Sequence, residues 1–237
     1  MIGSPSSASS VGYSAALLSE ESAFMRKVYA FMSGGLAVTA LAAWLVAHSP
    51  TALNLIFGNR LVFFGLIAAE LLMVFFFSAM ARTLTATGAG SLFFLYSVVN
   101  GMTLSVVFLI YTASSIYSTF LVTAATFAGM SAYGYITKRD LTGVGHFMIM
   151  GLWGLILASV MNLFMHSSTI YWLTTFMGVL VFVALTAYDT QKIRELNVAG
   201  NAGTDEDHKE AIHGALVLYL DFVNLFLYLL RLLGRRR

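Results

Sequence analysis

The chain has 237 residues, of which 59% are hydrophobic and only 10% are charged. Soluble globular chains are typically ~25% charged, so the composition indicates a membrane protein with no soluble domain. Thirteen bases against eleven acids leave a net charge of +2, which excludes a basic surface of the kind that binds nucleic acid, and the absence of cysteine excludes disulfides, thiolate metal sites and cysteine nucleophiles.

The first 23 residues differ in composition from the rest of the chain. They are rich in Ser, Gly and Ala, and no base precedes Arg26. They therefore lack the basic start and the apolar stretch of a signal peptide. We expect a disordered tail over residues 1–23, followed by one membrane domain over residues 24–237.

Seven apolar segments follow, each close to the ~20 residues that a helix needs to cross ~30 Å of hydrocarbon. Backbone groups in lipid must be satisfied within the spanning structure, and these segments have helical length rather than the ~10-residue alternation of barrel strands. The sequence therefore predicts an all-α polytopic membrane protein, a seven-helix bundle. The predicted spans are residues 28–47, 61–81, 92–111, 120–136, 147–165, 170–188 and 212–233.

The bases in the short loops predict the orientation, because cytoplasmic loops carry an excess of Lys and Arg. If the spans alternate, Arg60 and His166 are nearly all that one side has before the last helix. The other side is predicted to be cytoplasmic, with the N-terminus inside. Arginines 235–237 would then emerge outside, unless the last segment re-enters without crossing. The cytoplasmic side would collect Arg26, Lys27, Arg82, Lys138, Arg139, Lys192, Arg194 and Lys209.

Three acids, Glu70, Asp189 and Asp221, lie inside or at the ends of apolar runs. A carboxylate in hydrocarbon costs several kcal/mol, so such acids usually face a water-filled cavity or a partner. Asp221 shares one helical face with Asn224 and Tyr228, at i, i+3 and i+7, whereas the other faces are almost entirely apolar. A helix of this kind is best placed centrally, with its polar stripe lining a cavity. We expect Asp221 to meet Asp189, so that the two carboxyls share a proton and titrate as a pair.

Each acid also has a structural interpretation. Asp189 ends its span just before Lys192 and Arg194, and an ion pair at the interface would explain it. Asp221 would, in that interpretation, be protonated and hydrogen-bonded to a neighbouring helix, and Glu70 would make a structural hydrogen bond within the bundle. The alternatives stay open at this point.

Three strings resemble hallmarks of the bacterial branch of the Bax inhibitor-1 family, also called the TMBIM or LFG family. The resemblance runs from about Arg26 to Arg236. The strings are Tyr133-Gly134-Tyr135-Ile136-Thr137-Lys138-Arg139-Asp140-Leu141, Leu185-Thr186-Ala187-Tyr188-Asp189-Thr190-Gln191 and Leu218-Tyr219-Leu220-Asp221-Phe222-Val223-Asn224-Leu225-Phe226.

This resemblance implies six helices around a central C-terminal seventh, in the inner membrane of a bacterium. It also implies a pH-sensitive calcium leak that is gated by Asp189 and Asp221, which would hold calcium transiently. The arginine of the family's closed state matches Arg82 loosely, and a plain cytoplasmic anchor is the alternative for that residue. Glu70 matches an acid in the second helix of the family.

The leading interpretation is a passive pathway for calcium or another cation, without cofactor or catalysis. Carboxylates, amides and backbone carbonyls suit calcium, and a leak needs weak binding. The alternatives are a regulator that binds a membrane protease or another membrane protein, a cation–proton exchanger, and an intramembrane aspartyl protease. Tyr188-Asp189 resembles half of the protease signature, but the Gly-x-Gly-Asp half is absent before Asp221.

The loop before the last helix is the main departure from the family pattern. It looks longer and richer in acids, which suggests a cation-attracting mouth. His208 and His213, at the start of the last helix, are the next candidates for a pH sensor. The acids are Asp205, Glu206, Asp207 and Glu210.

Overall fold

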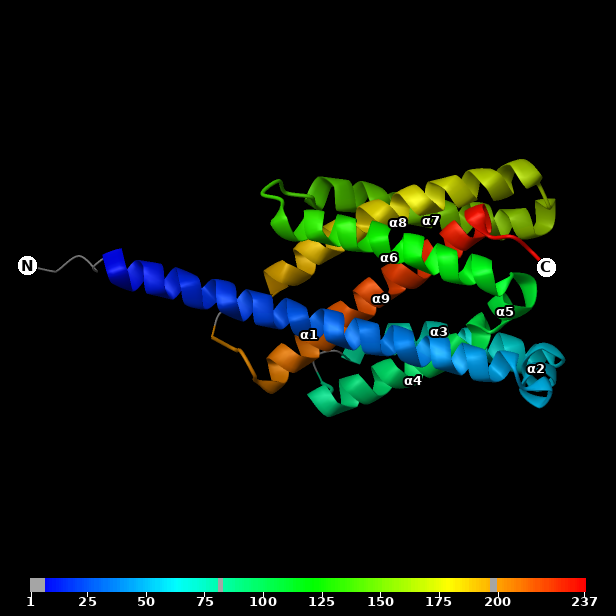
Figure 1. Ribbon diagram of the computed structural model, residues 1–237, viewed down its shortest axis with the longest axis horizontal. Coiled ribbons are helices and arrows are strands. Elements are labelled where there is room, and N and C mark those ends of the chain that lie inside the picture. The colour runs from blue at the N-terminus through cyan, green and yellow to red at the C-terminus, as the bar shows by residue number, and fades with distance from the viewer. Residues whose placement is uncertain (1–6, 81–82, 197–199) are drawn as a thin grey trace, which may run out of the picture.

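Helices make up almost all of the part of the chain that the structure, a computed structural model, describes: residues 7–80, 83–196 and 200–237 (Figure 1). The one extended pairing within these residues is Tyr111 opposite Arg236. The helices in these ranges are α1 (Ser7–Ala47), α2 (Pro50–Phe57), α3 (Arg60–Met80), α4 (Ala86–Leu104), α5 (Val106–Ile110), α6 (Ala113–Ile136), α7 (Thr142–Met165), α8 (Ser168–Leu196) and α9 (Asp205–Leu233).

Among the described residues, six helical segments are long and apolar enough to cross a membrane: α1, α3, α4 together with α5, α7, α8 and α9. The chain is therefore a polytopic all-α membrane protein, as predicted. The predicted span 120–136 lies in α6, which has 24 residues but is not among the six. Its Ser, Thr, Gly and Tyr residues lower its mean hydropathy relative to the other spans.

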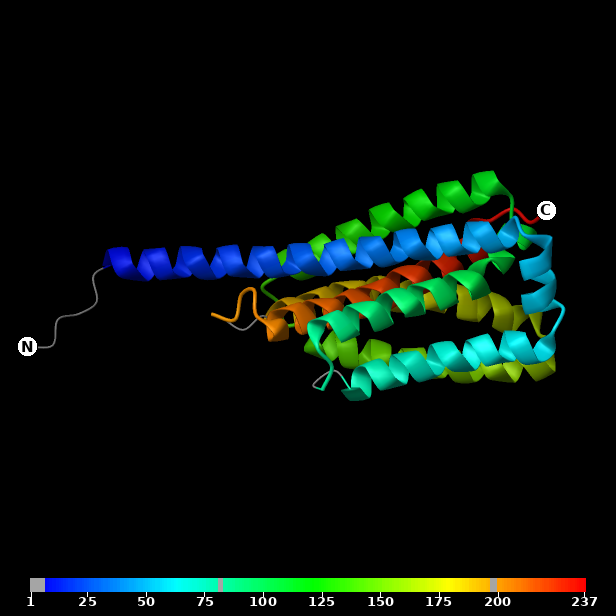
Figure 2. The same cartoon turned by 90° about the horizontal axis from the view of Figure 1, so that it is seen from below.

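The first helix begins earlier than the sequence suggests. α1 starts at Ser7 and continues for 41 residues, so most of the predicted tail over residues 1–23 belongs to this helix. Ala, Leu and Glu are good helix formers, and no proline lies between Pro5 and Pro50, so nothing stops the packed span from extending toward the N-terminus. At 1.5 Å per residue the helix is about 60 Å long, and its first part projects beyond the bundle (Figures 1 and 2). The division into a tail and a membrane domain stays a prediction.

The last helix, α9, runs diagonally through the middle of the molecule in both views (Figures 1 and 2). It packs mainly against α1, α4, α6 and α8, whereas α3 lies mainly against α4, and α7 against α8. Leu218, Tyr219 and Leu225 on α9 have no exposed surface. Burial of this helix explains why its sequence is apolar on nearly every side.

The two ends of the bundle differ in charge. The loops between α3 and α4, α6 and α7, and α8 and α9 lie at the end where α1 enters, which we call the base-rich end because it carries Arg26, Lys27, Lys138 and Arg139 (Figure 1). α2, α5 and the C-terminus lie at the opposite end.

The last segment therefore crosses the bundle instead of re-entering. The backbone N–H of Thr112 donates to the carbonyl of Arg235 at 3.1 Å, and the N–H of Arg237 donates to the carbonyl of Ile110 at 2.9 Å. These bonds dock the C-terminal arginines against the link between α5 and α6, at the end opposite Arg26.

Candidate functional site

Asp189 on α8 and Asp221 on α9 lie in contact, and their carboxyl groups share a hydrogen bond. This is the juxtaposition that the sequence predicts. Asp189 is half-buried, whereas Asp221 is only 5% exposed. Within the described residues, the Oδ2 atom of Asp221 is buried without a hydrogen-bond partner. The pair thus has one oxygen free to accept a proton or a cation.

Two glycines let neighbouring helices approach α8 just before Asp189. Gly145 on α7 leaves room for the ring of Tyr188, since a Cβ at that position would lie 2.5 Å from the ring. Gly134 on α6 faces Ala187, and a Cβ there would lie 2.9 Å from the Cα of Ala187 and closer still to its carbonyl oxygen. Gly134 belongs to the first family string and Gly145 follows it by four residues, but the sequence alone did not predict which side chains they contact.

Gln191, two residues after Asp189, ties α8 to the loop between α6 and α7. Its side chain is 5% exposed. The Nε2 group donates to the carbonyl of Arg139 at 2.9 Å, and the Oε1 atom accepts from the N–H of Leu141 at 2.8 Å. Because its side chain binds one backbone carbonyl and one backbone N–H of the loop, Gln191 fixes this turn of α8 relative to the loop. We did not identify it from the sequence, although it closes the second family string.

The predicted polar stripe on α9 faces α8. Asn224 donates from Nδ2 to the carbonyl of Leu220 in its own helix, at 2.8 Å. The ring of Tyr228 stacks on Phe182, with 5.8 Å between centroids and 27° between planes. Gly178 makes this possible, because a Cβ there would lie 2.6 Å from the Cζ atom of Tyr228. The stripe therefore forms a partly polar seam between α8 and α9.

Arg231 closes this seam toward the C-terminal end. Its guanidinium carbon lies 5.2 Å from the ring centroid of Tyr171 and 5.3 Å from that of Tyr228, which is cation–π geometry. Arg231 stands ten residues after Asp221 and three after Tyr228, so it belongs to the same helical face. Continuing the helical projection beyond Tyr228 would have found it.

Glu70 belongs to a second polar network, on the side of α9 that faces α3 and α4. Its carboxylate accepts hydrogen bonds from the hydroxyl of Thr103 and from Asn100 Nδ2, the latter at 3.2 Å. The Tyr219 hydroxyl donates to Asn100 Oδ1 at 2.9 Å and lies 2.6 Å from the Thr39 hydroxyl. The network thus joins four helices through hydrogen bonds.

Two of the acids predicted for the loop, Asp205 and Asp207, lie in the first turn of α9 and contact other elements. Asp207 forms an ion pair with Lys27 of α1 and accepts from the N–H of Gly203 at 2.8 Å. Asp205 accepts from the N–H of Ala86 at the start of α4, at 3.0 Å. Lys209 lies 3.5 Å from Asp205. These bonds join α9 to α1 and to the start of α4. They favour a structural role for these acids at the base-rich end, and not the predicted role of a cation-attracting mouth.

Three candidates remain, and two of them, His208 and His213, stand apart from the pair. Arg82 lies outside the described residues, so its predicted contact with Asp189 stays a prediction. The His213 ring stacks on Phe77 with 6.0 Å between centroids, and its Nδ1 atom is buried without a partner in the described part of the chain. His208 Nδ1 lies 2.8 Å from the carbonyl of Thr204, within the first turn of α9.

The arrangement limits the kind of cation site that the pair could form. Within the described residues, no three His, Asp or Glu side chains come together as a metal cage would require. Two carboxyls, with neighbouring carbonyls, are oxygen ligands of the type that calcium takes, but they are too few for tight binding. The chemistry open to the pair is proton exchange and transient cation contact.

Comparisons with known proteins show the family of the chain. The family described as "Inhibitor of apoptosis-promoting Bax1" matches residues 21–237. The inner membrane protein YbhL of Escherichia coli K12 is 49% identical over 215 residues, which cover 90% of this chain and 92% of that protein. A Borreliella burgdorferi protein is 44% identical over 214 residues, covering 90% and 92%, and a Rickettsia prowazekii protein is 43% identical over 215 residues, covering 90% of each. The chain therefore belongs to the Bax inhibitor-1 family of membrane proteins.

Proposed function

We propose that this protein is a pH-sensitive leak for calcium or a similar cation across a bacterial inner membrane, gated by Asp189 and Asp221. The observation that carries the proposal is the contact between the two carboxyls, with one oxygen of Asp221 buried and unpartnered. Two carboxyls in contact exchange protons as a unit and not as separate groups. Gain or loss of a proton changes the charge of the site within one pair of helices.

The proposed pathway follows the seam between α8 and α9. Asn224 and Tyr228 line it, and the central position of α9 supports a bundle of six helices around a seventh. A site with two carboxylates binds calcium weakly, as a leak requires, because an ion that is held tightly cannot leave. Glu70 supports the bundle through α3 and α4 in this proposal.

The proposed orientation places the base-rich end in the cytoplasm, since Lys and Arg are in excess in cytoplasmic loops. The N-terminus is then cytoplasmic and the C-terminus lies on the other side. Arg82, from the family resemblance, is proposed to pair with Asp189 in the closed state, so that Arg82→Ala raises the leak at neutral pH.

Calcium flux into liposomes made with the pure protein tests the proposal. Asp221→Asn is expected to reduce flux, because the amide loses the charge that draws a divalent cation. The double variant Asp189→Asn, Asp221→Asn is expected to lose the pH dependence of the wild type. Asp140→Asn is the matched control, since Asp140 is an acid in an exposed loop and should leave both properties unchanged.

Wild-type flux in Asp221→Asn would remove Asp221 from the pathway. A wild-type pH profile in the double variant would place the sensor elsewhere, with His208 and His213 tested next. A pH indicator inside the same liposomes separates a leak from a cation–proton exchanger, because only the exchanger moves protons in fixed ratio to calcium.

A further inference from the structure

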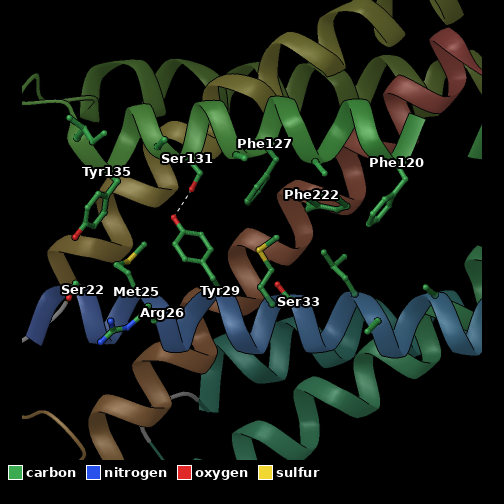
Figure 3. Close-up of a pocket in the computed structure, with 18 residues that line it drawn as sticks. Ser22, Met25, Arg26, Tyr29, Ser33, Phe120, Phe127, Ser131, Tyr135 and Phe222 are labelled. Carbon is green, nitrogen blue, oxygen red and sulfur yellow. Dashed lines mark hydrogen bonds between the residues drawn. The ribbon is translucent and has the colours of Figure 1, made fainter. Parts of the chain in front are cut away.

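A groove of about 750 Å³ lies between α1 and α6 (Figure 3). Its floor includes Phe127 of α6 and Phe222 of α9, whose ring centroids are 5.4 Å apart. The exposed surface of Ala37, Ala128 and Ile136 along its edges shows that it opens to the surroundings of the helices. In a membrane protein those surroundings at this depth are lipid.

The polar groups of the groove gather at one end. Ser22, Arg26 and Tyr135 lie at the base-rich end, whereas Phe120 lies at the other (Figure 3). Beyond Ser131, the lining toward Phe120 consists mainly of Ala, Met, Leu and Phe side chains. The groove therefore has a polar end, which would suit a phospholipid headgroup, and an apolar remainder, which would suit one acyl chain.

Arg26 is the one charged residue of the lining within the described part of the chain. Its neighbours are neutralised, because Lys27 pairs with Asp207, and Arg194 lies 3.8 Å from Glu21. Arg26 is exposed and has no ion-pair partner among the described residues. A guanidinium in this position suits a phosphate, which it binds with two parallel hydrogen bonds.

The length of the groove matches one leaflet of a bilayer. Arg26 and Ala40, both in the lining, are fourteen residues apart on α1, which corresponds to about 21 Å at the helical rise. Half of a bilayer, including its headgroup region, is ~20–22 Å thick. A lipid with its phosphate at Arg26 would thus reach the bilayer midplane near Phe120.

The side chains of the α6 wall are small, yet α1 and α6 are held apart. Ala124, Ala128 and Ala132 repeat at every fourth residue of α6, a spacing that usually lets helices approach closely. The long side chain of Tyr29 on α1 instead spans the gap, and its hydroxyl lies 2.6 Å from that of Ser131 on α6 (Figure 3). The groove is therefore a fixed feature of this packing.

We propose that this groove binds one anionic phospholipid from the leaflet at the base-rich end, with its phosphate on Arg26 and one acyl chain between α1 and α6. The proposal does not depend on ion conduction. The lipid would nevertheless contact one residue that is next to Asp221 and another that is hydrogen-bonded to the neighbour of Asp189. Phe222 follows Asp221, and Ser131 lies 2.9 Å from the hydroxyl of Thr190, which follows Asp189.

The test uses the full-length protein in nanodiscs and a phosphatidylglycerol that carries a photoreactive group in its acyl chain. Cross-linked residues are mapped by mass spectrometry and are expected on α1 and α6, around Met32, Phe120 and Phe127. Phosphatidylcholine with the same chains should cross-link about tenfold less, because it lacks net negative charge for Arg26. Arg26→Gln should remove this preference, whereas Arg139→Gln, an exposed base at the same end, should keep it.

A second pair of variants tests the groove itself. Ala128→Phe fills it and should abolish cross-linking to it, whereas Ala125→Phe adds the same ring to an exposed position of α6 outside the groove lining and should not. Equal labelling by the two lipids in the wild type, cross-links outside the groove, or equal cross-linking in Ala128→Phe and Ala125→Phe would each overturn the proposal. A cross-linked protein dimer joined through the groove would also overturn it, since a second copy would then be the occupant.

Discussion

Gly134 is the position where a single added carbon should do most damage near the aspartate pair. A Cβ on this residue would lie 2.9 Å from both the carbonyl carbon and the Cα of Ala187, with the carbonyl oxygen closer still. Carbon atoms in contact normally lie ~3.5–4.0 Å apart, so Gly134→Ala requires α6 and α8 to separate by about 1 Å. The atoms in the way are backbone atoms of Ala187, which cannot rotate away from the new methyl group as a side chain could.

The magnitude follows from comparing two glycines of the same helix. Overpacking of a tight contact costs about 1–3 kcal/mol, whereas replacing a helical Gly by Ala gains about 0.5–1 kcal/mol from helix propensity. Gly129 has nothing within 4 Å of its would-be Cβ, so Gly129→Ala should show only the gain. The gain is common to both variants, and their difference should equal the overpacking cost of about 1–3 kcal/mol.

Thermal unfolding of the two purified variants in the same detergent measures this difference. For a chain of this length, 1 kcal/mol shifts the Tm by about 2–4 °C, so Gly134→Ala should melt about 2–12 °C below Gly129→Ala. The absence of cysteine allows a second measurement, because an Asp189→Cys, Asp221→Cys pair can report on proximity by disulfide formation. The Gly134→Ala background should lower its yield. Equal melting temperatures for the two glycine variants would refute the close approach of α6 and α8.

Three further predictions concern contacts around the site. Lys27→Met leaves Asp207 almost completely buried without its cation and should destabilise the protein by about 3–5 kcal/mol, measured by thermal unfolding. The hydrogen bonds from Thr142 hold the pKa of Asp140 below its usual value. The stabilisation that these bonds give is therefore present above about pH 4 and is lost as the pH falls through the folded pKa. Asp140→Asn should lack this loss when unfolding is followed from pH 6 to pH 3. Gly178→Ala should destabilise the seam, and adding Tyr228→Ala should reverse part of this loss, because the ring that the new methyl group meets is then gone.

For the lysine and the glycine predictions the chain supplies a control. Lys192→Met removes a base from an exposed pair with Glu195, at 3.3 Å, and should cost at most about 1 kcal/mol. An equal loss in Lys27→Met would mean that Asp207 is hydrated in solution. Gly154 of α7 has nothing within 4 Å, so Gly154→Ala should be harmless. If Tyr228→Ala does not restore stability, the loss in Gly178→Ala comes from the backbone at residue 178 and not from a clash with the Tyr228 ring.

The sequence predicted those features that depend on one segment at a time. Length and hydropathy located six of the seven predicted spans, and the remaining one, 120–136, lies in α6, which is not among the candidate spans of the described chain. An i, i+3, i+7 pattern located the stripe of Asp221, Asn224 and Tyr228. The contact of Asp221 with Asp189 was also expected, from their positions near one end of neighbouring helices. Apart from this contact, the features that depend on two segments were missed. The small residues of α6 do not reveal a groove, because the same spacing would favour close packing against α1.

Helix α9 shows why the polar groups of the bundle are not equivalent. The projection assigned it one polar stripe, but Tyr219 stands two residues from Asp221 and so points to the opposite side, into the network of Glu70, Asn100 and Thr39. Polar groups at membrane depth must be satisfied within the protein. Glu70 meets this demand with two donors, which favours a structural role, whereas Asp221 keeps one buried oxygen without a partner in the described chain. An unsatisfied oxygen in that setting carries a free-energy cost that a proton or a cation would relieve, and this places the functional proposal on the α8 side of α9.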